Sequence, residues 1–204
     1  MTKRSRMALK TREKILDSAK KLFHEKGFEA VTIEDITNDA GVARGSFYTY
    51  FKSKSDIIVS EFRIIDAYYK KYAPNLRRYD SAISKLTAFT RAQMRYVKNI
   101  TGNEQLKVLY ANQTLEPGKN KIITDRNRYW HNLIKKIIED GQDSGEIRID
   151  LSAEELTVWF NRSIRGLFLD WCITSDEDFD LIKEGVHFCN SWLSRSLGVK
   201  EANE

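Results

Sequence analysis

The chain has 204 residues, of which 41% are hydrophobic and 11% aromatic, so it is long and apolar enough to bury a sizeable core. The net charge of +5 belongs to residues 1–54, which hold twelve Lys and Arg against seven Asp and Glu, whereas residues 55–204 hold twenty-two of each. This asymmetry indicates a nucleic-acid-binding part joined to a neutral part, although a positive excess can also serve solubility alone. Two prolines and no alternating apolar pattern exclude a mainly β protein and favour an all-α fold.

Several classes of function lack their residue patterns in this sequence. Cys172 and Cys189 are too few for a disulfide framework, and the sequence shows no signal peptide and no long uncharged apolar segment. His24, His131 and His187 do not have the spacing of metal ligands. No Gly-rich phosphate loop, nucleophile elbow or catalytic Cys/His/Asp set is visible. We therefore expect a cytoplasmic protein with no membrane segment, metal, cofactor or enzymatic activity.

A basic segment and a helix are predicted at the start of the chain. Residues 1–12 contain five Lys and Arg and no acid, which predicts a mobile arm that either follows a phosphate backbone or stays solvated. A helix is predicted from about Ala8 to Lys26, ended by Gly27. Its apolar face consists of residues spaced three and four apart: Ile15, Leu16, Ala19, Leu22 and Phe23.

Residues 32–51, TIEDITNDAGVARGSFYTYF, have the pattern of a helix-turn-helix. Thr32 followed by Asp35 three positions later predicts a capping box at the start of the first helix. Gly41 can adopt the left-handed backbone that a tight turn between helices requires. A second helix is predicted over about residues 44–50.

The second of these helices has one apolar and one polar face. Phe47 and Phe51, four residues apart, are expected in the core. The opposite face carries a guanidinium group, hydroxyls and phenols, which bond to base edges and phosphates in the major groove of DNA. These residues are Arg44, Gly45, Ser46, Tyr48, Thr49 and Tyr50. Taken alone, the same segment could also be no more than a small, well-capped helical hairpin.

Residues 15–36, ILDSAKKLFHEKGFEAVTIEDI, and 41–57, GVARGSFYTYFKSKSDI, together resemble the N-terminal domain of TetR-family transcriptional regulators. The resemblance implies a DNA-binding domain over residues 1–52 and an effector-binding and dimerisation domain over residues 53–204. One departure is Ala43, where members often have Ser or Thr, so this helix lacks a side-chain cap. The resemblance also implies phosphate contacts and base-facing positions. The phosphate contacts fall on Thr32, Tyr48, Tyr50 and Lys54, and the base-facing positions on Arg44, Gly45, Ser46 and Thr49.

The middle of the chain is predicted to be a series of amphipathic helices. The first runs from about Ser53 towards Pro74, and the resemblance implies that it couples effector binding to DNA binding. Apolar periodicity then predicts helices over about 83–100 and 104–114. A chain break is expected at Pro117-Gly118, followed by a long amphipathic helix over about 118–140.

Two apolar helices are predicted at the end of the chain, from Ser152 to Ile173 and from about Glu177 to Leu197. The first is apolar on nearly every side in its second half, and the last carries two apolar stripes. The simplest arrangement pairs both helices with a second copy in a four-helix homodimer interface; a thick monomer core is the alternative. The candidate interface residues are Gly166, Leu167, Trp171, Gly185, Phe188 and Trp192.

Aromatic residues gather in the region predicted to hold an effector. Any single one is more often a core residue than a ligand contact, but together they favour an aromatic-lined cavity. The candidates are Tyr68, Tyr72, Phe89, Tyr96, Tyr110, Tyr129, Trp130 and Trp159. Four arginines lie on bordering helices and are mostly expected on the surface, but one turned inward would suit an anionic effector. They are Arg91, Arg95, Arg126 and Arg162.

These observations favour a homodimeric, ligand-responsive DNA-binding regulator. We expect a repressor that is released from a palindromic operator when a small apolar or amphipathic effector binds. A DNA-binding regulator or architectural protein without an effector is the alternative. A helical enzyme is a remote one, because no convergent acid, base or nucleophile is visible.

Overall fold

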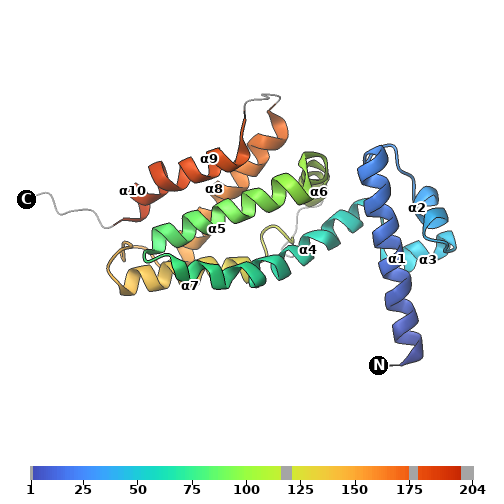
Figure 1. Ribbon diagram of the computed structural model, residues 1–204, viewed down its shortest axis with the longest axis horizontal. Coiled ribbons are helices and arrows are strands. Elements are labelled where there is room, and N and C mark those ends of the chain that lie inside the picture. The colour runs from blue at the N-terminus through green and yellow to red at the C-terminus, as the bar shows by residue number, and fades with distance from the viewer. Residues whose placement is uncertain (1, 116–120, 175–178, 199–204) are drawn as a thin grey trace, which may run out of the picture. The chain divides into compact units, whose positions relative to one another are not determined.

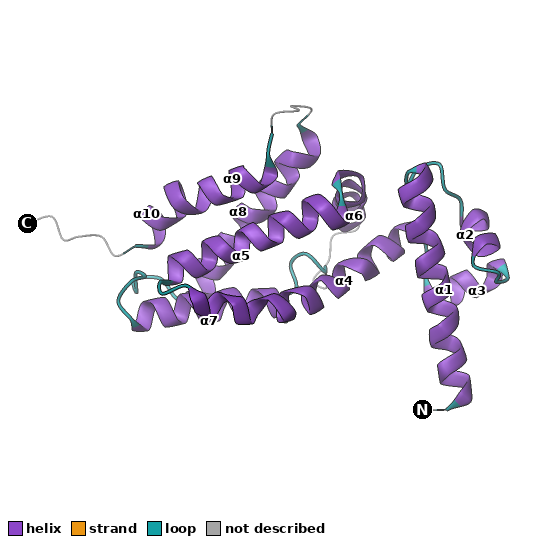
Figure 2. Cartoon of the chain, viewed as in Figure 1, coloured by secondary structure: helices purple, strands orange, loops and turns teal. Residues whose placement is uncertain are grey.

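A computed structural model describes residues 2–115, 121–174 and 179–198, and within them the chain is helical, with no β-strand (Figures 1 and 2). One isolated antiparallel bridge joins Ile147 and Gly198. The predicted all-α class is confirmed. The chain divides into two compact units, Met1–Arg63 and Ile64–Glu204, and the functional division after residue 52 stays a prediction. None of the described helices is long and apolar enough to cross a membrane.

Unit 1 is a small helical core around the helix-turn-helix. It contains α1 (Lys3–Lys26), α2 (Ile33–Asp39), α3 (Arg44–Tyr50) and the first turns of α4 (Lys54–Tyr72). All four helices contribute fully buried side chains, among them Ile15, Ala19, Ile36, Phe47 and Ile57.

The basic segment at the start of the chain is part of a helix rather than a mobile arm. α1 begins at Lys3, earlier than the predicted start near Ala8. The Thr2 hydroxyl caps the helix by accepting a hydrogen bond from the backbone N–H of Ser5 at 3.2 Å. Arg4, Arg6, Lys10 and Arg12 therefore follow one another with helical spacing.

The predicted local signals of the helix-turn-helix are all present. The Thr32 hydroxyl accepts from the Asp35 N–H at 3.1 Å, and the Asp35 carboxylate accepts from the Thr32 N–H at 2.8 Å, which completes the capping box. Gly41 has a φ of 63°, in the left-handed region where a residue with a Cβ is strained. The helix after the turn starts without a side-chain cap at Ala43, as the sequence predicts.

Unit 2 is a bundle in which α5 (Ala82–Tyr96) contacts both α7 (Tyr129–Asp143) and α9 (Leu181–Phe188) (Figure 1). Nine of the 15 residues of α5 are buried. α8 (Ala153–Ile173) packs against α7, α9 and α6 (Asn103–Leu115). Shorter elements complete the unit: η1 (Ala73–Arg78), η2 (Val97–Thr101), η3 (Cys189–Leu193) and α10 (Ser194–Leu197).

The long helix expected over residues 118–140 begins later than predicted, at Tyr129. Residues 121–128 form turns instead. The Asp125 carboxylate accepts from the Asn127 N–H at 2.9 Å, a local bond that competes with helix formation. The expected break at Pro117-Gly118 lies outside the described residues.

The last two predicted helices are present, but the final one is not regular. α8 begins after Ser152, whose hydroxyl and backbone form a capping box with Glu155. The final helix consists of α9, a π-helical turn η3 and α10. Its predicted start at Glu177 lies outside the described residues.

Gly185 packs against α5 of the same chain. The sequence instead predicted it at the interface where helices of two copies cross. The residue is buried, and a Cβ added to it would lie 2.8 Å from Cγ of Met94 on α5. Its missing side chain therefore lets α9 approach α5 closely. A Cβ added to Gly166, by contrast, would have no heavy atom within 4 Å, so this glycine lies on an open part of α8.

Candidate nucleic-acid interface and ligand cavity

The polar face of α3 is open to solvent, whereas Phe47 and Phe51 are buried beneath it. Arg44, Gly45 and Thr49 are exposed, and Tyr48 keeps 51% of its surface exposed. Ser46 and Tyr50 are half-buried. The structure therefore presents the predicted base-facing positions on one accessible helix, although their contacts with bases stay a prediction.

Tyr48 and Thr32 combine a local structural role with an accessible polar group. The Tyr48 ring packs edge-on against Phe47, with centroids 5.5 Å apart, which orients the phenol outward. The Thr32 hydroxyl also donates to Asp35 at 2.6 Å, and this hydrogen bond and that of the Thr32 backbone lower the pKa of Asp35. Their predicted phosphate contacts remain untested.

Lys54 is not placed as the resemblance implies. Its ammonium group donates to the backbone carbonyls of Phe28 at 2.7 Å, Val31 at 3.0 Å and Glu29 at 3.2 Å. It also lies 4.3 Å from the centroid of the Phe28 ring. A lysine ammonium has three donor hydrogens, so these carbonyls use its full capacity. In this structure Lys54 holds the turn after α1 and is not a free phosphate ligand.

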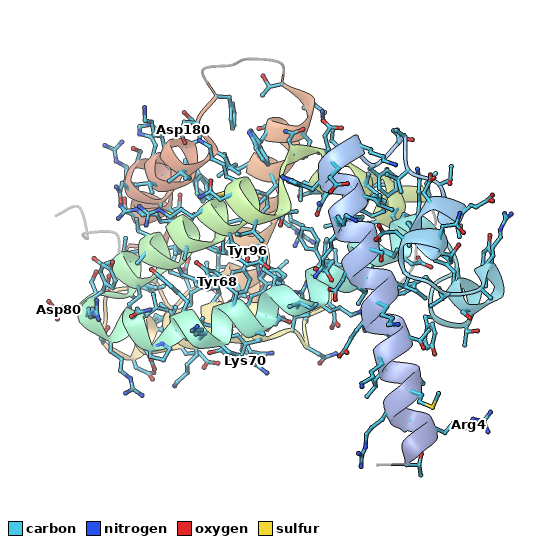
Figure 3. The ribbon with its side chains drawn as sticks, turned by 45° about the vertical axis from the view of Figure 1, so that its right-hand side comes forward. Arg4, Tyr68, Lys70, Asp80, Tyr96 and Asp180 are labelled. Carbon is cyan, nitrogen blue, oxygen red and sulfur yellow. The ribbon has the colours of Figure 1, made fainter. Side chains whose placement is uncertain are left out.

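Three of the eight predicted effector-pocket residues form one aromatic cluster in unit 2. The ring centroids of Tyr68 and Tyr96, both labelled in Figure 3, lie 4.6 Å apart. Those of Tyr68 and Tyr72 stack at 6.2 Å. Tyr72 also donates to the Ala88 carbonyl at 3.3 Å. Tyr68 therefore contacts Tyr72 on its own helix and Tyr96 on α5.

The other predicted pocket residues are more scattered. Phe89 is fully buried against Tyr69, Tyr129 lies under the ammonium group of Lys70, and Trp159 is 54% exposed. The Tyr110 hydroxyl donates to the Arg165 carbonyl at 2.9 Å, and burial raises the pKa of Tyr110. Of the eight, only Trp130 lines the cavity between α7 and α8.

That cavity lies between α7 and α8, has a volume of about 150 Å³ and is partly open to solvent. It combines an apolar wall of Trp130 and Val158 with several cationic and polar side chains. The remaining lining residues are Thr124, Arg126, His131, Asn161, Arg162 and Arg165. The sequence analysis named Arg126 and Arg162 as residues that border a pocket, but it did not include Arg165, His131 and Asn161. The spacing of Val158, Asn161 and Arg165 could have indicated them, because it places the three on one face of a helix.

Hydrogen bonds join two lining residues of this cavity, His131 and Asn161, to each other and to Glu154. The His131 Nε2 lies 3.3 Å from the Glu154 carboxylate, and the Nδ1 of the same ring lies 3.2 Å from the Asn161 amide nitrogen. Burial opposes ionisation of Glu154, but hydrogen bonds and charges from His131 and Lys135 lower the pKa of this carboxyl overall. Glu154 is therefore a carboxylate that fixes His131, which in turn fixes Asn161.

A second polar cluster ties α4 to the segment that precedes α7. The guanidinium of Arg128, 8% exposed, donates to the Asp66 carboxylate at 3.0 Å and to the Ile122 carbonyl at 3.3 Å. Burial raises the pKa of the adjacent Tyr69, against the opposing effect of the Arg128 charge. Such a buried ion pair costs desolvation and is sensitive to the loss of either partner.

The predicted dimer-interface residues other than Gly185 keep part of their surface exposed. Trp192 is 54% exposed and stacks on Phe188 with ring centroids 5.3 Å apart. Gly166, Leu167 and Trp171 are half-buried on α8. These positions leave an apolar surface on α8 and the final helix, and their role in pairing stays a prediction.

Metal-ligand types and cysteines were predicted to form no site, and the described residues show how they lie. No group of three or more His, Cys, Asp or Glu there could hold a metal ion. Cys172 and Cys189 are buried free thiols, and burial raises the pKa of each to about 11.

Comparison with known proteins identifies the helix-turn-helix unit. Residues 15–60 match the family model described as "Bacterial regulatory proteins, tetR family", and relatives similar along most of the chain are regulators of the same kind. Residues 15–60 therefore form the DNA-binding domain typical of TetR-family regulators.

Two relatives and one solved structure are similar to this chain beyond unit 1. It is 25% identical over 161 residues to the HTH-type transcriptional repressor KstR2 of Mycolicibacterium smegmatis, covering 78% of each protein. It is 25% identical over 172 residues to the fatty acid metabolism regulator protein of Bacillus subtilis, covering 82% of this chain and 86% of that one. The fold is similar to that of Thermus thermophilus FadR, with a TM-score of 0.72, 22% identity, and coverage of 95% and 98%.

Proposed function

We propose that this chain is a TetR-family transcriptional repressor that binds an operator as a homodimer and is released by a small effector. The observation that carries the proposal is the exposed polar face of α3, which presents Arg44, Tyr48 and Thr49 over a buried Phe47. One such helix contacts few base pairs, whereas two related by a two-fold axis address a palindrome with half-sites one helical turn apart. Dimerisation is typical of the family, and the partly exposed Phe188 and Trp192 support it.

We further propose that the effector is amphipathic, with an acyl-coenzyme A thioester as the first candidate. The FadR structure with the same fold was solved in complex with lauroyl-CoA, and one relative is a fatty acid metabolism regulator. The cavity between α7 and α8 supports this choice, because an apolar wall and arginines suit a ligand that is part apolar and part anionic.

The ion pair between Asp66 and Arg128 supports a route from effector to DNA. α4 begins in unit 1 and ends in unit 2, and Asp66 lies on its second half. The segment before α7 supplies both Arg128 and the cavity residues Thr124 and Arg126. An effector that moves this segment would shift Asp66, and with it α4. The effector must favour one of two arrangements for its binding to change DNA affinity.

Two substitutions on α3 test the DNA interface. Tyr48→Phe removes a phosphate donor and should weaken binding to all sequences alike, whereas Arg44→Ala should relax preference at particular base pairs by about 1–3 kcal/mol. Operators selected from a random duplex pool, followed by mobility-shift titration at fixed salt, measure both effects. Arg77→Ala, an exposed arginine in unit 2, is the matched control. Unchanged binding by both α3 variants would contradict the interface.

One substitution tests the route through the ion pair. Asp66→Asn should leave DNA affinity and effector affinity close to normal but reduce the factor by which lauroyl-CoA weakens DNA binding. Fluorescence anisotropy of labelled operator, with and without lauroyl-CoA, gives all three quantities. A coupling factor equal to that of the unsubstituted protein would remove Asp66 from the route.

A regulator or architectural protein without an effector is the alternative function. It would bind DNA with unchanged affinity in the presence of every candidate effector, and thermal shifts would detect no stabilising ligand. We place the repressor in the cytoplasm with its operator, and enzymatic activity is no part of the proposal.

A further inference from the structure

The cavity between α7 and α8 carries more positive charge than the nearby carboxylates neutralise. Glu154 contacts Arg126 at 3.1 Å and Lys135 at 3.4 Å. Among the residues for which the structure gives positions, no carboxylate pairs with Arg162 or Arg165. Burial lowers the pKa of Arg165, and the neighbouring charge of Arg162 lowers it further, against an opposing effect of Tyr110. A bound anion would relieve this repulsion.

Arg165 is already held in a position that borders the cavity. Its guanidinium donates one hydrogen bond to the Ile123 carbonyl at 3.2 Å, which leaves further N–H groups for a ligand. Arg162 lies one turn earlier on the same helix and is exposed. Two guanidinium groups of α8 and a third from the segment before α7 thus meet at one site. Planar guanidinium groups bind phosphate and carboxylate oxygens in pairs of hydrogen bonds.

A buried polar side chain on α8 lies beside these arginines. Asn161 is 3% exposed and lines the cavity, and its Oδ1 has no hydrogen-bond partner among the residues that the structure describes. Its amide nitrogen is occupied by the ring of His131, which Glu154 holds from the other side. The His131–Asn161 pair therefore fixes part of the cavity wall next to Arg162.

The size of the cavity limits what part of a ligand it can take. Ligand sites that bury a whole drug-sized molecule usually enclose about 300–1,000 Å³. At about 150 Å³, this cavity has room for an anionic group and a few adjoining atoms. The Trp130 and Val158 side chains offer apolar contact to those adjoining atoms, so the rest of the ligand must extend beyond the cavity.

We propose that Arg126, Arg162 and Arg165 bind the phosphate or carboxylate end of an amphipathic effector. This assignment rests on the proposed function, because it gives the effector its charge class and its orientation. The sequence predicted a cavity lined by aromatic side chains. In the proposed site three arginines select the ligand, and Trp130 is the one predicted aromatic residue in its lining.

Three probes of equal chain length distinguish the possible anions. Dodecyl phosphate, laurate and uncharged dodecanol, each below its micelle concentration, are titrated calorimetrically into the full-length protein. The double variant Arg126→Gln with Arg162→Gln removes two exposed guanidinium groups. The matched control changes two exposed arginines elsewhere in unit 2, Arg77→Gln with Arg78→Gln.

The assignment predicts that at least one anionic probe binds at least about 10-fold more weakly to the double variant than to the control, while dodecanol binds both alike. A larger loss for dodecyl phosphate identifies a phosphate ligand, and a larger loss for laurate a carboxylate ligand. Anion binding should also change tryptophan fluorescence, and Trp130→Phe should abolish that change while binding persists. Equal anion affinities for variant and control, or no anion binding to the unsubstituted protein, would overturn the assignment.

Failure of this assignment can be told apart from failure of the proposed function. DNA binding and its release by lauroyl-CoA are measured on the same double variant. Normal DNA binding with undiminished release would refute the arginine site and leave the repressor intact. If the unsubstituted protein binds no operator, the proposed repressor function is contradicted instead.

Discussion

The two units of this chain differ in how their functional residues are brought together. In unit 1, the residues of the exposed helix-turn-helix surface that is predicted to face DNA lie within 20 consecutive positions, and the turn at Gly41 sets their geometry. In unit 2, the cavity is assembled from residues 124–131 and 158–165, which meet only because α7 packs on α8. A local site depends on caps and turns, whereas an assembled site depends on the packing of the whole bundle.

The largest expected effect is a loss of stability confined to unit 1. Phe47→Ala empties a fully buried position in unit 1 and should cost about 3–5 kcal/mol of the free energy of unfolding. Hydrogen exchange should show lost protection in unit 1 and DNA binding should disappear, while binding of dodecyl phosphate persists. Loss of anion binding by this variant would show that the cavity depends on unit 1.

A pair of glycines tests close packing in unit 2. Gly185→Ala places a Cβ 2.8 Å from Met94 and should destabilise the protein by about 1–3 kcal/mol. Gly166→Ala meets no atom within 4 Å and should be neutral or stabilising by up to about 1 kcal/mol, because Ala favours the helix. Urea unfolding compares the two. If the Gly166→Ala variant is instead destabilised, and its unfolding midpoint depends on protein concentration, Gly166 lies at the dimer interface.

The sequence predicted unit 1 closely because its signals are local. Thr32, Asp35 and Gly41 determine the helix ends through bonds and dihedral angles within a few residues. Lys54 was misplaced because its hydrogen bonds to residues 28–31 are tertiary contacts that spacing does not reveal.

In unit 2, the sequence predicted most helices but not the site. The pattern of apolar residues continues through residues 122–128, and only the side-chain bonds of Asp125 and Arg128 show that this segment forms turns. Gly185 was assigned to a crossing between copies because helical periodicity cannot tell an internal neighbour from a second chain. The His131–Asn161 pair joins two helices and has no signature in either one.

A smaller effect is expected at the capping box of α2. Thr32→Ala should cost about 1 kcal/mol, the usual value for a lost N-cap. The pKa of Asp35 is lowered by its bonds to Thr32, so the stability it contributes is present above the ordinary Asp pKa of about 3.9 and is lost as the pH falls through the lower folded-state value. Urea unfolding at pH 7 and pH 3 should therefore show a smaller difference between Thr32→Ala and the unsubstituted protein at pH 3.

The smallest effect concerns the two thiols of unit 2. With pKa values of about 11, Cys172 and Cys189 hold very little thiolate at pH 8, so both should react slowly with iodoacetamide. Mass spectrometry of the native and the urea-unfolded protein measures the two rates. Rapid modification of either native thiol would mean that its helix opens readily.

The most direct test of the account is the DNA affinity of the full-length protein with and without an effector. Fluorescence anisotropy of a selected palindromic duplex at fixed salt, titrated in the absence and presence of saturating lauroyl-CoA, measures it. We expect the effector to weaken operator binding about 5- to 150-fold, the usual range of allosteric coupling. Tight effector binding that leaves operator affinity unchanged would contradict it.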